Sequence, residues 1–295
     1  ARILGYRRAR GATEPLLARA EETDAVVAKA AFDALAAVAS LDELPKVIPV
    51  ATSRTEGEVR DRAEKALYAI CLKQNDVSRR SEPLANALPG TPTPTARASL
   101  LQVMAMLADP AGARALGEAC GDPVPETRDT ALRLLVNWPD STPVPTLLRV
   151  FKTTTNDVHR ILALKGIVTL ASLRPGDPTA SASTSAPKPP SAEAVAWLTE
   201  ARAALRPNAE ERKILVSGLG DLNAAPGLRL LEPYLADPEV HHDAELAALR
   251  AIRNLTTDAD RAAARPLLEK IMASTLDPDV RKQAQDALRG SSPKP

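Results

Sequence analysis

The densest cluster of side chains that could do chemistry is His241-His242-Asp243-Ala244-Glu245. On a helix, His241 and His242 precede Glu245 by four and three residues, so imidazole and carboxylate could share a face. A carboxylate-bridged metal site needs this arrangement from at least two helices, with further glutamates. The sequence holds no second copy of the cluster. We therefore expect no metal and no other cofactor, and we interpret these residues as polar surface groups at the start of a repeat.

A second pattern, Trp138-Pro139-Asp140, matches the loop in which tyrosine phosphatases carry a general acid. That chemistry also needs a cysteine nucleophile with an arginine six residues later. At that offset Cys71 is followed by Val77 and Cys120 by Glu126. The sequence also lacks Gly-x-Ser-x-Gly and Gly-x-x-x-x-Gly-Lys-Ser/Thr patterns. We predict that the protein is not an enzyme and that a helix ends at Trp138, with its indole wedged between repeats.

Composition narrows the class of partner. The chain has 38 basic and 37 acidic residues, a net charge of +1, whereas dedicated nucleic-acid or membrane-surface binders usually carry a clear basic excess. No apolar run approaches the roughly 20 residues that span a bilayer. The cysteines Cys71 and Cys120 form no Cys-x-x-Cys pair, so we interpret them as buried thiols, with a disulfide or redox pair as the alternative.

The elements that position these residues follow from an internal repeat. The stretch Asp277-Pro-Asp-Val-Arg-Lys-Gln-Ala-Gln-Asp-Ala-Leu288 has a helix N-cap at Asp277, proline at the first helical position and apolar residues spaced by three and four. Related stretches start at 24, 56, 93, 124, 155, 207, 237 and 277. A second amphipathic stretch precedes each one: 13–22, 41–52, 76–88, 111–120, 142–152, 192–205, 224–236 and 258–274. Each unit is thus predicted to be helix, turn, helix.

These Asp-Pro-x-Val-Arg-x-x-Ala-x-x-Ala-Leu stretches resemble the HEAT-repeat family of α-solenoids, including its bacterial HEAT-like branch. The resemblance implies an all-α fold, a right-handed α-α superhelix of about eight helix-turn-helix repeats. It also implies that Arg60 and Arg281 form ladders with acidic residues of neighbouring repeats. HEAT-repeat di-iron hydroxylases carry several His-Glu dipeptides, and this sequence has none.

Domain boundaries follow from composition. The Pro/Ser/Thr/Ala-rich segment 175–191 has no aliphatic residue larger than Ala and is predicted to be disordered. It is either a loop on one edge of a continuous solenoid, the alternative that we favour, or a hinge between arms 1–174 and 192–289. Residues 290–295 are predicted to be a frayed tail. Residues 1–6 look like the end of a helix whose start has been removed, which leaves the compartment undefined, cytoplasmic or periplasmic.

The repeat motif indicates the architecture and says little about the function. Stacked helix pairs make an extended surface, so we expect a non-catalytic scaffold that binds a protein partner. The sequence does not define the oligomeric state. The candidate contacts are polar positions of the second helices: Lys29, Lys65, Arg133, Lys165, Lys213, Arg250 and Arg253. Two alternatives stay open. One is nucleic-acid binding, as in HEAT-like DNA glycosylases. The other is an accessory module of a larger enzyme, exported or not, or an enzyme of the phycobilin-lyase type.

Overall fold

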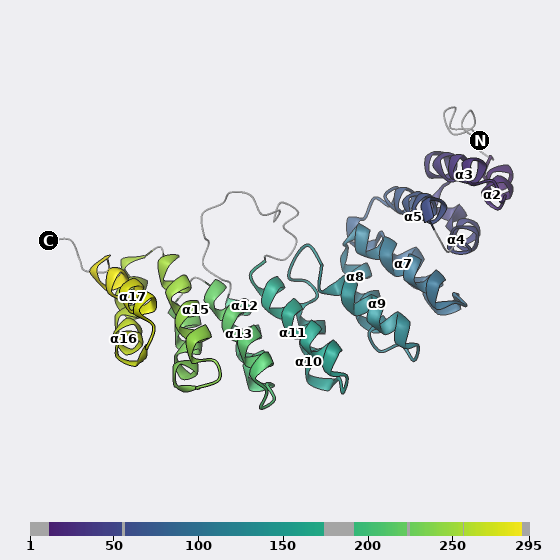
Figure 1. Cartoon of the computed structure of the whole chain (residues 1–295). Helices are drawn as coiled ribbons and strands as arrows, with labels where there is room; N and C mark the ends of the chain where they lie inside the picture. Colours follow the sequence, from purple (N-terminus) through teal and green to yellow (C-terminus); the bar gives the residue numbers. More distant parts are fainter. Residues whose placement is uncertain (1–11, 55–56, 174–191, 223–224, 256, 291–295) are drawn as a thin grey trace. The chain divides into compact units, whose positions relative to one another are not determined.

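The computed structural model describes residues 12–54, 57–173, 192–222, 225–255 and 257–290. All regular secondary structure in these ranges is helical, which confirms the all-α prediction. Figure 1 shows the α-helices following one another as antiparallel pairs. The first helices of the pairs are α2 (Thr13–Ala20), α4 (Leu44–Thr52), α6 (Glu82–Ala87), α8 (Pro110–Ala119), α10 (Val144–Thr153), α12 (Ala192–Ala203), α14 (Ala225–Leu231) and α16 (Asp258–Ser274). The second helices are α3 (Ala25–Val38), α5 (Gly57–Cys71), α7 (Pro94–Leu107), α9 (Pro125–Leu135), α11 (Asp157–Ala171), α13 (Ala209–Asp221), α15 (His241–Arg253) and α17 (Pro278–Gly290).

Each second helix begins within four residues of its predicted start, and at most of them a local side chain caps the first turn. Asp24 accepts from the backbone N–H groups of the first turn of α3, and Thr93, Asn156 and Asn208 do the same for α7, α11 and α13. Asp277, the predicted cap, accepts from the N–H of Asp279 at 2.8 Å, at the start of α17. The stretches that start at 93, 155 and 207 lack the Val-Arg dipeptide of the repeated phrase, but their capping residues still mark where the helices begin.

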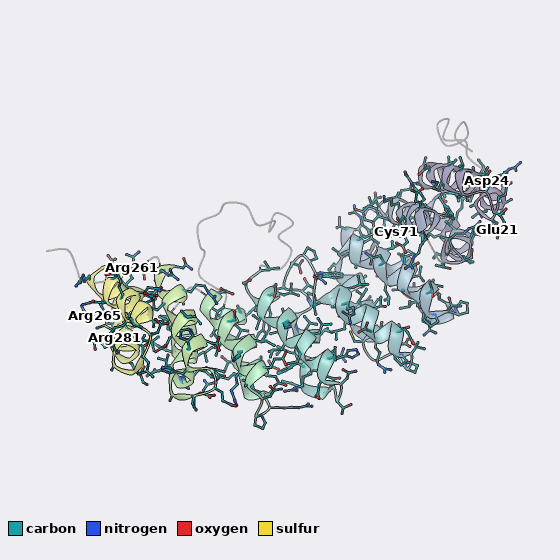
Figure 2. The ribbon with its side chains drawn as sticks, viewed as in Figure 1. Glu21, Asp24, Cys71, Arg261, Arg265 and Arg281 are labelled. Atoms are coloured by element: carbon teal, nitrogen blue, oxygen red, sulfur yellow. The ribbon has the colours of Figure 1, made fainter. Side chains whose placement is uncertain are left out.

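A recurring hydrogen bond closes the turn before many helices. A side chain near the helix start donates to the carbonyl oxygen six residues earlier, in the turn that follows the preceding helix. Arg97, Arg128, Arg261 and Arg281 make this bond with their guanidinium groups at 2.7 to 3.0 Å. Figure 2 labels Arg261 and Arg281 on the pair α16–α17.

This bond corrects one prediction. Arg281 donates to the carbonyl oxygen of Thr275 at 2.7 Å, inside its own pair, and not to an acidic residue of a neighbouring repeat. Arg60 forms its ion pair with Glu64 on its own helix at 2.8 Å. The arginine of the repeated phrase is thus structural, as expected, but it stabilises its own helix and turn.

The core is built from small and aliphatic side chains. Alanine and leucine fill most buried positions, and the only two phenylalanines, Phe32 and Phe151, are fully buried. Small residues let neighbouring helices approach closely, which explains how 2% aromatic content suffices. Trp138 is buried, at 3% exposure, but α9 ends at Leu135, three residues before the predicted end, and Trp138 lies in the following turn.

The chain divides into two compact units, Ala1–Trp138 and Pro139–Pro295. In the first unit the second helices α3, α5, α7 and α9 pack in sequence, and the first helices α2, α4, α6 and α8 form a parallel layer. In the second unit α11, α13, α15 and α17 pack in sequence over α10, α12, α14 and α16. Each unit therefore has a second-helix layer and a first-helix layer.

Some predictions fall on residues outside the described ranges: the helix end at 1–6, the disordered segment 175–191 and most of the tail 290–295. Helices α11 and α13, on either side of residues 175–191, pack against each other within the second unit. The division into arms 1–174 and 192–289 stays a prediction. No helix in the described part of the chain is long and apolar enough to cross a bilayer.

Candidate protein-binding surface

The seven candidate contact residues all lie on second helices, in the layer that each unit exposes on one side. Lys29, Lys65 and Arg133 belong to α3, α5 and α9 of the first unit. Lys165, Lys213, Arg250 and Arg253 belong to α11, α13 and α15 of the second unit. Since α11, α13 and α15 pack in order, the four cations of the second unit share one continuous layer.

Four of the seven cations are held in ion pairs. Lys29 pairs with Glu58 of the next second helix, and this hydrogen bond lowers the pKa of the Glu58 carboxyl group. Lys213 lies 3.6 Å from the Asp243 carboxylate, so it also bridges neighbouring helices. Arg133 instead pairs with Asp129 one turn earlier on α9, at 2.8 Å.

Arg250 is the most firmly held of the four. Its Nε lies 3.0 Å from the Asp221 carboxylate, and its Nη2 donates to the backbone carbonyl oxygen of Ser217 at 2.7 Å. Both partners belong to α13. Arg250 therefore fixes the spacing between α13 and α15 as well as facing solvent.

The sequence does contain a signal for these pairs that our prediction did not use. Lys29 and Glu58 are 29 residues apart, as are Asp33 and Arg62, which join the same two helices at 3.1 Å. Lys213–Asp243 and Asp221–Arg250 have nearly the same separation. This spacing is close to the shortest repeat period, so opposite charges separated by it meet across adjacent second helices.

The remaining three cations are exposed and have no ion partner among the described residues. They are Lys65 on α5, Lys165 on α11 and Arg253 on α15. Aliphatic side chains lie exposed on the same layer of the second unit: Val158 at 65% and Leu246 at 41%. We call Val158, Lys165, Lys213, Leu246 and Arg253 the α11–α15 face.

Close helix contact makes this face continuous. A Cβ atom at Gly218 would lie 2.2 Å from Cγ1 of Val168 on α11, and a Cβ at Gly220 would lie 2.9 Å from Cβ of Ala247 on α15. Because glycine has no Cβ atom, α13 can pack closely against both α11 and α15 at these two positions. Both glycines belong to the last turns of α13, in the stretch Ser217-Gly-Leu-Gly220.

A buried ion pair lies beneath the α11–α15 face. Nε of Arg160 on α11 donates to the Glu211 carboxylate on α13 at 2.6 Å, and both side chains are less than 5% exposed. Arg160 also lies 4.0 Å above the Phe151 ring. Burial opposes ionisation of Glu211, but the hydrogen bonds from Arg160 and from the Arg206 N–H outweigh it and lower the pKa of Glu211. The pair stabilises the packing of α11 on α13.

The side chains singled out for chemistry are arranged for structural roles. The Asp140 carboxylate is buried and accepts from the Thr142 N–H at 2.8 Å, capping a turn. Cys71 is fully buried and Cys120 is half-buried, and neither forms a disulfide within the described ranges. Burial, together with the nearby Asp109 carboxylate, raises the pKa of the Cys71 thiol to about 12. Figure 2 shows Cys71 at the end of α5.

The His241-to-Glu245 cluster differs from its prediction. The Glu245 side chain is only 2% exposed, so it is not a surface group, although His242 is more than half exposed. Nε2 of His241 and Nδ1 of His242 lie 3.0 and 3.6 Å from the two Glu245 oxygens. Within the described ranges no three His, Cys, Asp or Glu side chains are arranged to hold a metal ion.

Comparisons with known proteins concern the fold. No protein-family model matches the sequence, and no curated protein matches it either. Among solved structures, Kap121p bound to Pho4p is similar to 93% of this chain, with 16% identity and a TM-score of 0.53. Kap121p alone is similar to 94%, with 12% identity and a TM-score of 0.54. This chain spans about a third of the length of both Kap121p chains, 33% in each case.

A human deoxyhypusine hydroxylase also matches along its length, covering 97% of this chain and 98% of that one at 17% identity. Its TM-score of 0.34 is too low to carry an argument about activity. The structural similarity to Kap121p, a karyopherin, agrees with the eight helix pairs and with the layered packing within each unit. The fold of this chain is thus a HEAT-like α-solenoid.

Proposed function

We propose that the protein is a non-catalytic scaffold that binds a protein partner through its second-helix layer, with the α11–α15 face as the principal contact. Stacked helix pairs expose extended surfaces of this kind, and such surfaces are how solenoid proteins usually bind. The observation that carries the proposal is the combination of unpaired cations, Lys165 and Arg253, with the exposed aliphatic residues Val158 and Leu246 on one layer.

The face is also held rigid before any partner binds. The ion pairs of Lys213 and Arg250, the glycine contacts of α13 and the buried Arg160–Glu211 pair fix three neighbouring helices. A surface that is already ordered loses less conformational entropy on binding, which favours affinity. Unpaired cations on such a surface favour a partner segment with acidic and apolar side chains.

The absence of catalysis is part of the proposal. The Cys71 thiol is buried with a raised pKa, and Glu211 is buried in an ion pair, so neither is placed to react with a substrate. The near-neutral charge favours a protein partner over nucleic acid, which usually requires a basic surface. An accessory role beside an enzyme is compatible with the same face and would appear as an enzyme among the bound proteins.

The experiment places a photo-cross-linking amino acid at Lys165 or Arg253 of the full chain and identifies the proteins captured from source lysate. Charge reversal then tests the face: Lys165→Glu and Arg253→Glu should each weaken binding of the captured protein about tenfold. The matched control is Arg229→Glu, which reverses an exposed cation on first helix α14 and should leave binding unchanged.

Two results would count against the proposal. Equal weakening by Arg229→Glu and Arg253→Glu would show a general charge effect without a specific face. Binding to duplex DNA that falls steeply with salt, with no protein captured, would favour the nucleic-acid alternative.

A further inference from the structure

The α11–α15 face carries positive charge at two separate places. Lys165 on α11 and Arg253 on α15 are both exposed, and no carboxylate in the described part of the chain forms an ion pair with either of them. Between them, Arg250 and Asp221 neutralise each other in an ion pair at 3.0 Å. The face therefore presents two cations on either side of a region without net charge.

Two ion pairs define how the three helices of this face are aligned. Arg160 of α11 lies 2.6 Å from Glu211 of α13, and Lys213 of α13 lies 3.6 Å from Asp243 of α15. Residues at the same level therefore differ in number by 51 between α11 and α13 and by 30 between α13 and α15. This alignment fixes which side chains lie opposite one another.

The alignment gives the separation of the two cations. Lys165 is level with Leu246 of α15, and Arg253 lies seven residues beyond Leu246. Seven residues make two turns, which advance about 10.5 Å and return to nearly the same side of the helix. Neighbouring helix axes are about 8–10 Å apart, so the step from α11 to α15 covers roughly 16–20 Å. Together these displacements place the two cations about 19–23 Å apart.

The region between the cations favours an extended polypeptide over a helix. Ser217 of α13 is exposed in this region, and its hydroxyl group has no partner in the described ranges. An extended chain has unpaired backbone N–H and C=O groups that can bond to this hydroxyl, whereas a helix bonds its own backbone internally. In the polyproline II conformation every third residue faces the same side, about 9.3 Å further on, which matches the spacing of the helices.

The charges and the distance together define the partner. Unpaired cations favour acidic side chains at matching places on the bound molecule. At about 3.1 Å per residue, a separation of about 19–23 Å corresponds to roughly six or seven residues of extended chain. We propose that the α11–α15 face binds an extended segment with two acidic side chains at this spacing, one against Lys165 and one against Arg253. The inference rests on the proposed function, because it names the chemistry of the partner for the same face.

The test measures binding of synthetic peptides to the full chain by fluorescence anisotropy at low ionic strength, where charge contacts are least screened. Each peptide has two glutamates, three, six, seven or twelve positions apart, in a stiff background of proline, alanine and serine. We expect spacings of six and seven to bind about tenfold more tightly than the other spacings or a peptide with one glutamate. A helical peptide with glutamates fourteen residues apart spans a similar distance of about 21 Å and should bind less tightly.

Variants of the chain locate the bound peptide. Lys165→Glu and Arg253→Glu should each weaken binding of the best peptide about tenfold, and replacing one of its glutamates by lysine should recover part of the loss. Ser217→Ala should weaken it about threefold. The matched control is Lys65→Glu, which reverses an exposed cation without an ion partner in the described part of the first unit, and it should leave binding unchanged.

Several outcomes would overturn the inference: affinity that does not depend on the spacing, tightest binding by the helical peptide, no binding by any peptide, or equal weakening by Lys65→Glu. The proposed function fails separately. It fails if the protein captured from lysate binds the Lys165→Glu and Arg253→Glu variants as tightly as the unchanged chain.

Discussion

Two adjacent second helices of the second unit each bury a glutamate, and the two carboxylates have different partners. Glu211 on α13 faces Arg160, a permanent cation from the neighbouring pair, with Nε to Oε1 at 2.6 Å. Glu245 on α15 faces His241 from its own helix, with Nε2 to Oε1 at 3.0 Å. Both carboxylates are about 2% exposed, so both need a compensating charge.

The difference lies in what each carboxylate holds together. Arg160 also reaches the carbonyl oxygens of Phe151 and Ala204, so the Glu211 pair is a fully connected link between two helix pairs. Glu245 has one aligned hydrogen bond from outside its helix, from Thr275. We expect the first contact to stabilise the unit more than the second and to be more costly to break.

The largest expected effect comes from removing the permanent cation. Arg160→Met should destabilise the second unit by about 3–5 kcal/mol because the Glu211 carboxylate would stay buried without its balancing cation. Urea unfolding, followed by a probe in the second unit, measures the loss. The double variant Arg160→Met/Glu211→Met should be more stable than the single variant, since no uncompensated charge remains. A double variant as unstable as the single would show that side-chain packing, and not charge, explains the loss.

Acid should act on the same pair. The pKa of Glu211 is lowered in the folded state, so this group contributes stability above the ordinary carboxyl range, and the contribution is lost as pH falls through the folded pKa. We expect the stability of the wild-type second unit to decline from about pH 4.5 downward. Glu211→Gln should show a shallower decline over this range. Parallel curves for the two proteins would contradict the assignment.

A substitution at the α11–α13 contact tests how much close helix packing, in addition to the Arg160–Glu211 pair, stabilises this contact. Gly218→Ala places a Cβ atom 2.2 Å from Cγ1 of Val168 and should push α11 away from α13. We expect a loss of about 1–3 kcal/mol, reduced by the better helix propensity of alanine. Val168→Ala in the same chain should restore most of the stability. The control is Gly121→Ala, whose Cβ meets its nearest atom at an ordinary 3.4 Å.

Features that depend on neighbouring residues in the sequence could be predicted, whereas contacts between residues far apart in the sequence could not. The eight helix pairs follow from caps and from apolar spacing, which are local, so Asp24, Thr93 and Asp277 mark their helices correctly. The burial of Glu211 depends on Arg160, 51 residues earlier across the segment 175–191. Glutamate is rarely buried, so without that partner in view an exposed position is the natural prediction.

For the candidate surface, the helix positions of the cations were predicted, but their partners were not. Placing the seven cations on second helices needed only helical periodicity, and their positions on those helices are as expected. Recognising that Lys29 and Lys213 bridge neighbouring helices needed the 29- to 30-residue spacing of opposite charges. Lys65, Lys165 and Arg253 have no such partner in the described part of the chain, and the binding role of all seven cations stays a prediction.

The smallest expected effect concerns the weaker contact. Thr275→Val removes the hydroxyl group that donates to Glu245 at 3.2 Å and that accepts from the Asp277 N–H at 3.2 Å, while keeping the side-chain shape. We expect a loss of about 1–2 kcal/mol, confined to α15–α17, because a buried carboxylate oxygen loses its hydrogen-bond donor. Hydrogen exchange of the terminal helices measures it.

A neighbouring hydroxyl group provides the control. Ser274 donates to the backbone carbonyl oxygen of Lys270 at 3.0 Å on the exposed side of α16, and Ser274→Ala should change the protection of these helices little. Equal effects of the two substitutions would mean that the Thr275 contact is an ordinary helix-end bond. A larger loss in Thr275→Val than in Ser274→Ala would show that the hydrogen bond to Glu245 holds the terminal pair on α15.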